Sequence, residues 1–200
     1  MLTLFHAPRS RSTRFIFLLE EIGVPYEIKV VNIRRSDGSG AVDLDNPHPL
    51  GKVPALIHDG VTVFESSAII LYLTDTFPAS GLGPQSADRG RGAYLSLLSY
   101  YGSVLEPAFV SKFLNTPVPR GTAGWAPVEE ALAYIEGLLA NGPYLLGEEF
   151  SAVDILYGTT FAMFKNAPIM PPSPVIAEYA DRVVARPAFA RAQRKDATGS

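Results

Sequence analysis

Residues 51–67 combine groups that can hold an amino acid head group and the peptide bond next to it. An apolar helical pattern begins at Ser66, and the free N–H groups and positive dipole end of a helix start attract a carboxylate. Glu65 stands beside that helix start and can take an ammonium group. If the Val53–Pro54 bond is cis, the backbone N–H and C=O of Val53 face outward and can pair with an extended peptide. One ligand can use the helix start with Glu65 and also the Val53 backbone if its amino acid head is joined to a neighbouring peptide bond.

A second set of reactive groups lies in the polar, basic loop at residues 7–12. Its hydroxyls, on Ser10 and Ser12, can donate to an anion, although both residues can equally be loop residues and Ser12 fits the N-cap of the helix that follows. The chain has no cysteine, so it offers no thiolate nucleophile, disulfide or zinc-thiolate site. Its three histidines lack metal-ligand spacing, and we expect no metal.

The first part of the chain predicts the scaffold for these groups. Two alternating strands, 2–6 and 26–33, flank a helix with apolar spacing at 15–22, which implies a parallel pair joined by a right-handed crossover. Asp59-Gly60 predicts a tight turn between two further strands at 55–57 and 61–64. A helix from Ser67 to about Phe77 then covers the sheet. The order is β-α-β followed by β-β-α.

Beyond residue 78 the strand signal disappears. We therefore predict a first domain at residues 1–78, a linker rich in Pro, Gly and Ser at 79–86, and an all-helical domain at 87–200. Pro107 should kink the first long helix of that domain or divide it in two. The later helices are predicted at 128–139, 155–167, 175–185 and from 187 to about 193.

A capping box precedes the most apolar of these helices. Ser151 is placed to accept from the amide of Asp154, and the Asp154 carboxylate can reach back to the amide of Ser151. Phe150 and Ile155 fall at the two positions of a hydrophobic staple. We expect the helix that follows to be central in its domain.

Val53-Pro54, a hairpin and then Glu65-Ser66 at a helix start resemble the glutathione-binding half of cytosolic glutathione S-transferases. The box at Ser151 is similar to the buried box of their helical domain. The resemblance spans residues 2–193 and implies an α+β fold, a thioredoxin-like domain followed by an all-α helical bundle. The family usually has a short helix in the region of 34–51; here we expect it to be reduced or mobile, because glycines and prolines disfavour it.

The resemblance implies a glutathione site formed by Lys52, Val53, Pro54, Glu65 and Ser66. Taken alone, Glu-Ser at a helix start can be a simple cap, and Lys52 can be a solvated lysine. In serine-type transferases the catalytic hydroxyl lies four residues before a helical arginine that resembles Arg14, which selects Ser10, with Ser12 and Arg11 as alternates.

The implied chemistry is activation of a thiol, whose free pKa is about 8.5. A hydrogen bond to a charged group contributes about 1.5–3 kcal/mol, and one pKa unit corresponds to about 1.4 kcal/mol. One well-placed hydroxyl can therefore lower the thiol pKa by about one to two units. The electrophile is expected to meet aromatic side chains of the helical domain, which at helical spacing also fit a plain core: Tyr94, Tyr101, Phe109 and Phe113.

We expect a glutathione S-transferase that conjugates glutathione thiolate to small hydrophobic electrophiles, as in detoxification. The alternatives are a glutathione-dependent isomerase or peroxidase on the same fold, or a non-catalytic transferase-like binding protein. No cofactor is expected besides glutathione as co-substrate, and the resemblance implies a homodimer. A net charge of −3 favours neither nucleic acid nor a membrane surface, and no apolar run approaches the ~20 residues of a membrane span. The expected location is the cytoplasm.

Overall fold

The computed structural model describes residues 1–198, and these form two compact units. The first unit contains residues 1–80 together with the chain from Arg186 onward. The second unit contains Gly81–Ala185. Gly199 and Ser200, which the prediction included in the helical domain, lie outside the described residues.

A four-stranded mixed sheet organises the first unit, in the order β2-β1-β3-β4. The strands are β1 (Leu2–His6), β2 (Glu27–Val30), β3 (Ala55–His58) and β4 (Val61–Phe64). β1 pairs in parallel with β2 and antiparallel with β3, and β3 pairs antiparallel with β4. Asp59 and Gly60 both have positive φ, as the predicted tight turn requires. The predicted βαβ-ββα order of a thioredoxin-like domain is confirmed.

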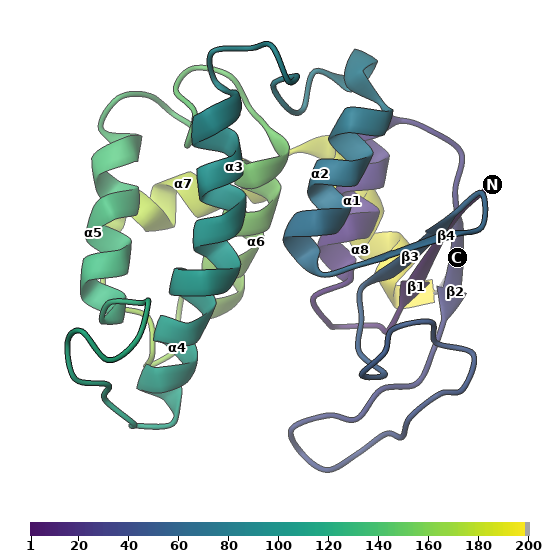
Figure 1. Ribbon diagram of the computed structural model, residues 1–200, viewed down its shortest axis with the longest axis horizontal. Coiled ribbons are helices and arrows are strands. Elements are labelled where there is room, and N and C mark those ends of the chain that lie inside the picture. Colours follow the sequence, from purple (N-terminus) through teal and green to yellow (C-terminus); the bar gives the residue numbers. More distant parts are fainter. Residues whose placement is uncertain (199–200) are drawn as a thin grey trace. The chain divides into compact units, whose positions relative to one another are not determined.

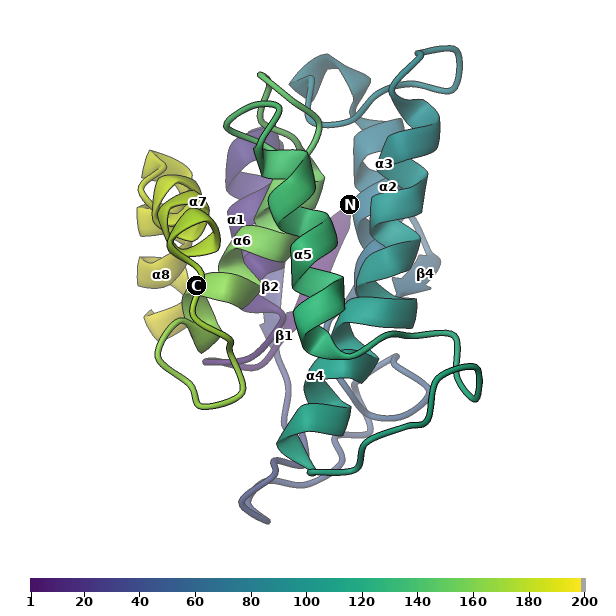
Figure 2. The ribbon, with the colours of Figure 1, turned by 90° about the vertical axis from the view of Figure 1, so that its left-hand side faces the viewer.

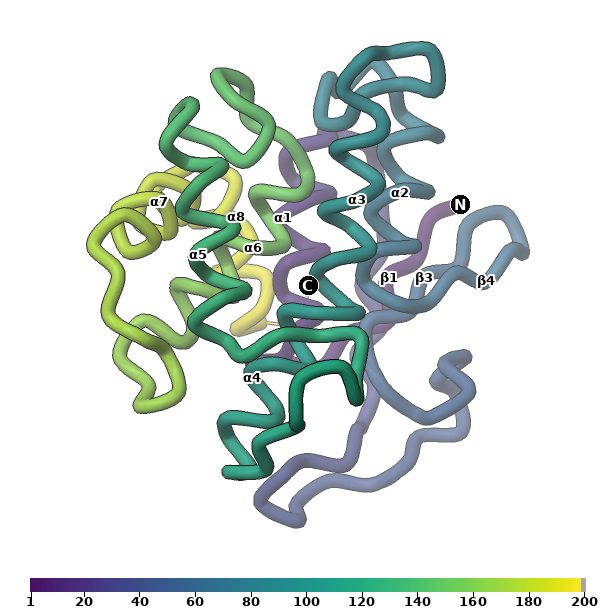
Figure 3. Tube along the Cα trace, turned by 60° about the vertical axis from the view of Figure 1, so that its left-hand side comes forward, coloured from purple at the N-terminus to yellow at the C-terminus, as the bar shows by residue number. Residues whose placement is uncertain are grey.

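Two helices lie side by side on one face of this sheet, α1 (Thr13–Ile22) and α2 (Ser66–Thr76) (Figures 1 and 3). Gly23, at φ 77°, ends α1 in the left-handed conformation that glycine adopts without a Cβ penalty. Five consecutive residues of α1, from Phe15 to Leu19, are fully buried, so this helix is the core of the unit. A short 3₁₀ turn, η1 (Pro78–Ser80), follows α2.

The last helix, α8 (Pro187–Thr198), packs on α1 and belongs to the first unit. The prediction assigned all of residues 87–200 to one helical domain, and the structure corrects this for the last helix. Phe189 meets Phe17 edge to face at 5.5 Å, and Arg186 donates to both oxygens of Glu21. The helical pattern of α8 shows that it has an apolar face, but it does not show which unit that face packs on. The domain of this helix was therefore predicted wrongly.

Residues 31–54 contain neither helix nor strand in the structure. The helix that transferases usually place here is therefore absent, as the glycines and prolines indicated.

The second unit is all helical. A long helical segment runs through α3 (Arg91–Tyr100), the π-helix η2 (Tyr101–Leu105) and α4 (Glu106–Phe113) (Figure 3). Pro107 lies directly after the π turn, at the start of α4. The wider π turn accommodates the proline ring and the hydrogen bond that proline cannot donate, so the chain continues as a helix beyond Pro107.

The remaining helices of this unit are α5 (Val128–Leu139), α6 (Ala152–Phe164) and α7 (Pro174–Val184) (Figure 2). Every residue of α6 from Ala152 to Phe161 is buried, so α6 is central in its unit. A Cβ on Gly158 would come within 2.6 Å of Val183, which shows how closely α6 and α7 approach. None of the helices described in residues 1–198 is long and apolar enough to span a membrane.

Candidate functional site

Glu65 and the first turn of α2 form one half of the candidate site. Glu65 has φ 71° and ψ 131°, a region that residues with a side chain rarely occupy, and such strain concentrates at ligand sites. Its side chain is 72% exposed. Ser66 is the first residue of the helix, and the N-terminal turn of a helix directs its backbone N–H groups outward. A carboxylate bound there would meet backbone donors, the positive end of the helix dipole and a neighbouring anion for an attached ammonium group.

Val53 and Lys52 form the other half, immediately before β3 in the sequence. The Val53–Pro54 bond is cis, the condition on which the sequence argument depended. Among residues 1–198, neither the N–H nor the C=O of Val53 is paired with another backbone group. The Lys52 side chain is exposed, while its carbonyl accepts from Asn46 Nδ2 at 2.9 Å.

His48 lies beside Glu65, and the sequence analysis gave it no role. Its buried Nδ1 accepts from the Leu50 amide at 3.1 Å, so the proton is on Nε2, which lies 4.0 Å from Glu65 Oε1. Its ring packs against that of Phe64 in a tilted arrangement, with 5.3 Å between centroids and 56° between the ring planes. Burial lowers the pKa of His48 and outweighs the opposing effect of Glu65. His48 therefore acts as a neutral spacer beside Glu65; the Asn-Pro-His-Pro run was the available signal.

The two serines of the first loop are hydrogen-bonded to each other. Ser10 is half-buried, and its Oγ lies 2.7 Å from Ser12 Oγ and 3.2 Å from the Ser12 amide. Ser12 is fully buried and sits at the N-cap position of α1, yet its side chain caps no amide of the helix. It contacts His6 Nδ1 at 2.8 Å and accepts from the Ala7 amide at 3.2 Å. The cap interpretation of Ser12 was wrong, because the hydroxyl turns toward β1.

An aspartate from the far end of the chain completes this region. Asp196, on α8, accepts from the Arg9 amide with both oxygens at 3.2 Å and from the Thr13 hydroxyl. Its Oδ1 lies 3.3 Å from Nε2 of the buried His6. The alternate catalytic residue Arg11 is exposed, beyond this buried cluster. Sequence reasoning missed Asp196 because no local spacing connects residue 196 with residues 6–13.

The predicted electrophile-binding aromatics divide into two groups. Tyr94, Tyr101 and Phe109 are at most 5% exposed and pack in the core of the second unit, whereas Phe113 is 70% exposed. Their burial agrees with the plain-core interpretation of their helical spacing. A cavity of about 250 Å³ lies in the same unit beside Lys112, Trp125 and Glu129, and none of the four aromatics lines it. No group of three or more metal-ligating side chains occurs among residues 1–198.

Comparison with known proteins agrees with this geometry. Residues 1–75 match the family model described as the N-terminal domain of glutathione S-transferase, and residues 118–182 match that of its C-terminal domain. The chain is 33% identical to glutathione S-transferase 3 of Schizosaccharomyces pombe, covering 77% of this chain and 70% of the relative. It is 26% identical to maleylacetoacetate isomerase of Rattus norvegicus, covering 84% and 80%.

A solved structure titled as a sphingomonad glutathione S-transferase complexed with glutathione is 30% identical to the chain. It has a TM-score of 0.76 and covers 98% of both chains. Two domain matches in the right order, a thioredoxin-like unit, a helical unit and a relative above 30% identity agree with one another. The chain therefore belongs to the glutathione S-transferase family.

Proposed function

We propose that this protein binds glutathione and transfers its sulfur to small hydrophobic electrophiles. The observation that carries the proposal is the strained, exposed Glu65 in front of α2, on a chain that shares this fold with glutathione transferases. Because the Glu65 side chain is exposed, its packing does not explain why the backbone keeps this strained conformation. Binding of a ligand with both an ammonium group and a carboxylate explains the strained conformation.

The parts of glutathione match the two halves of the site by charge and shape. The γ-glutamyl carboxylate suits the start of α2 at Ser66, with its backbone donors and positive dipole end, and its ammonium group suits Glu65. The cysteinyl backbone suits Val53, as an added strand would, and Lys52 suits the glycine carboxylate. These contacts leave the thiol to be oriented by the first loop.

Ser10 is the residue we assign to the thiol. It is the half-buried hydroxyl of its loop, whereas Ser12 is fully buried and cannot reach a ligand directly. A hydrogen bond to the thiolate supplies about one to two pKa units, enough to populate the thiolate near neutral pH. The reaction needs no cofactor beyond glutathione as co-substrate.

Isomerisation is the second candidate activity, favoured by the 26% identity to a protein named maleylacetoacetate isomerase. The same thiolate would add to the substrate and later leave it, so the glutathione site serves both reactions. The two candidates differ in whether glutathione is consumed.

The test measures glutathione binding by calorimetry and then turnover of a generic aryl halide with glutathione. Binding with turnover supports the transferase. Binding with glutathione-dependent isomerisation of a maleyl substrate, and no consumption of glutathione, supports the second candidate. Binding without either reaction indicates a transferase-like binding protein, and absence of binding by wild type overturns the whole assignment.

We also propose a homodimer. Leu50 (69% exposed) and Phe64 (39% exposed) are large apolar side chains on the first unit that a partner subunit would cover. Light scattering at micromolar concentration should give about twice 21.6 kDa. A monomeric mass would reject the dimer and leave the glutathione site untouched. The cytoplasmic location stays a prediction, to be checked by cell fractionation.

A further inference from the structure

Four side chains of the first unit form a continuous series of polar contacts that ends at the half-buried Ser10. Ser10 Oγ lies 2.7 Å from Ser12 Oγ, which lies 2.8 Å from His6 Nδ1. His6 Nε2 lies 3.3 Å from Asp196 Oδ1. We call this series the Ser10–Asp196 relay. Its inner members are buried: His6 and Ser12 are fully inaccessible and Asp196 is 6% exposed.

The carboxylate determines the tautomer of the imidazole. Nε2 of His6 is buried and lies 3.3 Å from Asp196 Oδ1, although the geometry of this contact is not that of a hydrogen bond. A bare nitrogen lone pair at 3.3 Å from a carboxylate is repelled, whereas an N–H is attracted. The proton of neutral His6 is therefore on Nε2, and Nδ1 is an acceptor.

Counting protons then orients both serines. Because Nδ1 accepts, the Ser12 hydroxyl donates to His6 at 2.8 Å in preference to the Ala7 carbonyl at 3.4 Å. The lone pairs of Ser12 then accept from the Ala7 amide and from Ser10. The Ser10 hydroxyl therefore points inward. One lone pair of Ser10 accepts from the Ser12 amide, and the other is free to accept a proton. With neutral His6, Ser10 cannot donate to a thiolate without losing its bond to Ser12.

We propose that the relay carries the proton of the glutathione thiol to His6, with Asp196 balancing the imidazolium charge. This rests on the proposed function, since Ser10 must meet the thiol. The S–H bond breaks and its electron pair stays on sulfur. The proton goes to Ser10 Oγ, the Ser10 proton goes to Ser12 Oγ, and the Ser12 proton goes to Nδ1 of His6.

After the transfer the Ser10–Ser12 and Ser12–His6 hydrogen bonds are kept with their direction reversed, while Nε2–H of His6 still faces Asp196. His6 donates to Ser12, Ser12 donates to Ser10, and Ser10 now donates to the thiolate. The same relay thus accepts the proton and then stabilises the anion that remains. When the product leaves, the proton returns along the relay to water at Ser10.

The surroundings of His6 suit a base that is neutral at rest. Burial lowers the pKa of His6, and Asp196 is the charged group that opposes this effect. From the first loop the imidazole contacts the neutral Ser12 hydroxyl, and from α8 it faces the Asp196 carboxylate, which supplies the counter-ion. Asp196 is fixed by the Arg9 amide and the Thr13 hydroxyl, so it needs little reorganisation when the charge appears.

Proton counting by calorimetry tests the relay. Glutathione is titrated into the protein in buffers of different ionisation enthalpy at about pH 7, and the thiolate formed is measured by its ultraviolet absorbance. If His6 keeps the proton, thiolate absorbance appears while the number of protons released to the buffer stays close to zero. Release of one proton per thiolate would overturn the relay.

Asp196→Asn removes the counter-ion and keeps an oxygen for the Thr13 hydroxyl. We expect the thiolate fraction at neutral pH to fall about tenfold, as for a loss of one pKa unit, with glutathione affinity little changed. Glu21→Gln is the matched control, because it breaks the contact of α8 with α1 through Arg186 without approaching His6. An equal loss in both variants would show that the effect is only structural and would overturn the relay.

The imidazole itself gives the decisive signature. Nitrogen NMR of His6 in wild type should change from the neutral Nε2–H form to the doubly protonated form when glutathione binds. A neutral ring beside a fully formed thiolate rejects the relay but leaves the transferase assignment in place. Absence of glutathione binding or of any thiolate signal is instead the failure of the proposed function.

Discussion

Glu65 shows at the scale of one residue how affinity and stability oppose each other. A side chain at φ 71° costs about 1–3 kcal/mol, a cost that glycine avoids. We predict that Glu65→Gly raises the free energy of unfolding by about 1 kcal/mol while weakening glutathione binding at least tenfold. Glu65→Ala, which keeps the strain and loses the carboxylate, is the control: it should weaken binding without stabilising. Chemical denaturation and calorimetry measure the two effects, and a Gly variant that binds normally would contradict the role of Glu65.

Ser10→Ala should separate binding from activation. The groups proposed to hold glutathione are elsewhere, so affinity should stay nearly unchanged. The pKa of the bound thiol should rise by about one to two units, and the conjugation rate at neutral pH should fall about ten- to a hundredfold. The loss should shrink as the pH rises, because base restores the thiolate. Thiolate absorbance against pH checks this, and an unshifted curve would remove Ser10 from the mechanism.

Ser12→Ala should shift the same curve, although Ser12 never touches the ligand. Its loss breaks the contact between Ser10 and His6 and leaves the buried Nδ1 of His6 without a donor. A cap residue would affect stability alone.

The sequence predicted the candidate residues that depend on neighbours along the chain. Glu65 and Ser66 were predicted from a helix start after a hairpin, and Ser10 from the resemblance of its spacing to Arg14 to that of serine-type transferases. The partners of Ser12 did not follow, because an N-cap position and a contact with β1 look identical in a linear pattern. His6 and Asp196 meet only through the packing of α8 on α1, which no local pattern encodes.

At the scale of elements, the capping box of α6 holds three segments together. Both Ser151 and Asp154 make their reciprocal contacts, and Asp154 also accepts from the Leu145 amide and the Tyr179 hydroxyl, both at 2.9 Å. Burial raises the pKa of Asp154, and the four donated hydrogen bonds oppose that effect.

We predict that Ser151→Ala lowers the free energy of unfolding by about 1–2 kcal/mol, since it removes a cap at a buried helix start. Glutathione affinity should not change, because the box belongs to the other unit. Ser173→Ala is the control: at a half-buried position it removes the N-cap contact of α7 with Ile176 together with a hydrogen bond to Glu136, and it should cost less. Urea denaturation compares the variants, and equal losses would show that burial adds nothing to the box.

Element positions were largely predictable, and their partners were not. Periodicity located β1, β3, β4 and α5 to within one residue, whereas β2 ends at Val30, three residues before the predicted end of that strand. The aromatic stripe of α3 and α4 has helical spacing whether it faces a pocket or a core. Burial of Tyr94 and Tyr101 answers that question, and the sequence could not.

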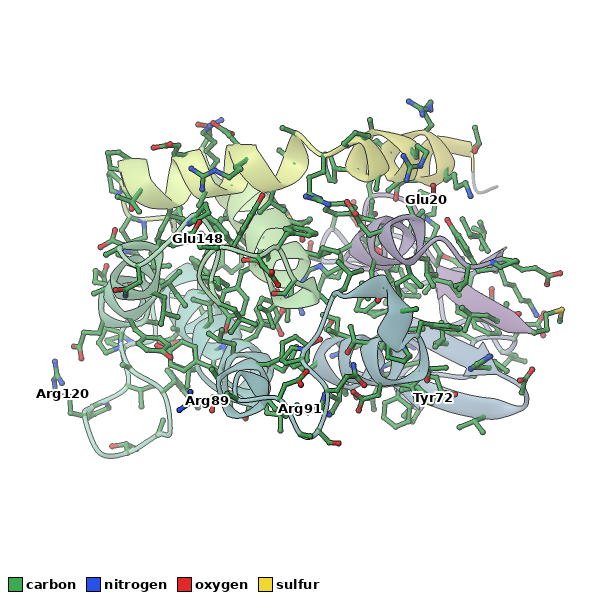
Figure 4. The ribbon with its side chains drawn as sticks, turned by 90° about the horizontal axis from the view of Figure 1, so that it is seen from above. Glu20, Tyr72, Arg89, Arg91, Arg120 and Glu148 are labelled. Atoms are coloured by element: carbon green, nitrogen blue, oxygen red, sulfur yellow. The ribbon has the colours of Figure 1, made fainter. Side chains whose placement is uncertain are left out.

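At the scale of the molecule, the chain returns to its first unit through α8, and Glu20 is a polar anchor of that return (Figure 4). Glu20 accepts from Arg191 Nε at 2.6 Å, from Lys195 Nζ at 2.8 Å and from the Tyr26 hydroxyl at 2.8 Å. Burial opposes ionisation, but these donors outweigh it and lower the pKa of Glu20 to about 2.

The lowered pKa makes the anchor sensitive to acid. Since the folded pKa lies below the unfolded value of about 4.5, the stabilisation is complete above pH 4.5 and is lost as the pH falls toward 2. The shift corresponds to at most about 3 kcal/mol, reduced by screening because Arg191 and Lys195 are 43% and 38% exposed. We predict that Glu20→Gln lowers the free energy of unfolding by about 1–2 kcal/mol at neutral pH. The difference from wild type should vanish as the pH falls through this window.

Glu178→Gln is the control, because Glu178 is 77% exposed and its pair with Arg182 lies within one helix, so no measurable change is expected. Chemical denaturation at a series of pH values gives the difference in the free energy of unfolding between wild type and variant. The effects of the other carboxylates are common to both proteins and drop out of this difference. A difference that stays constant from neutral pH to pH 3 would mean that Glu20 acts through packing and not through its charge. In that case the ion pairs between α1 and α8 would set the position of the last helix without contributing to the free energy of unfolding.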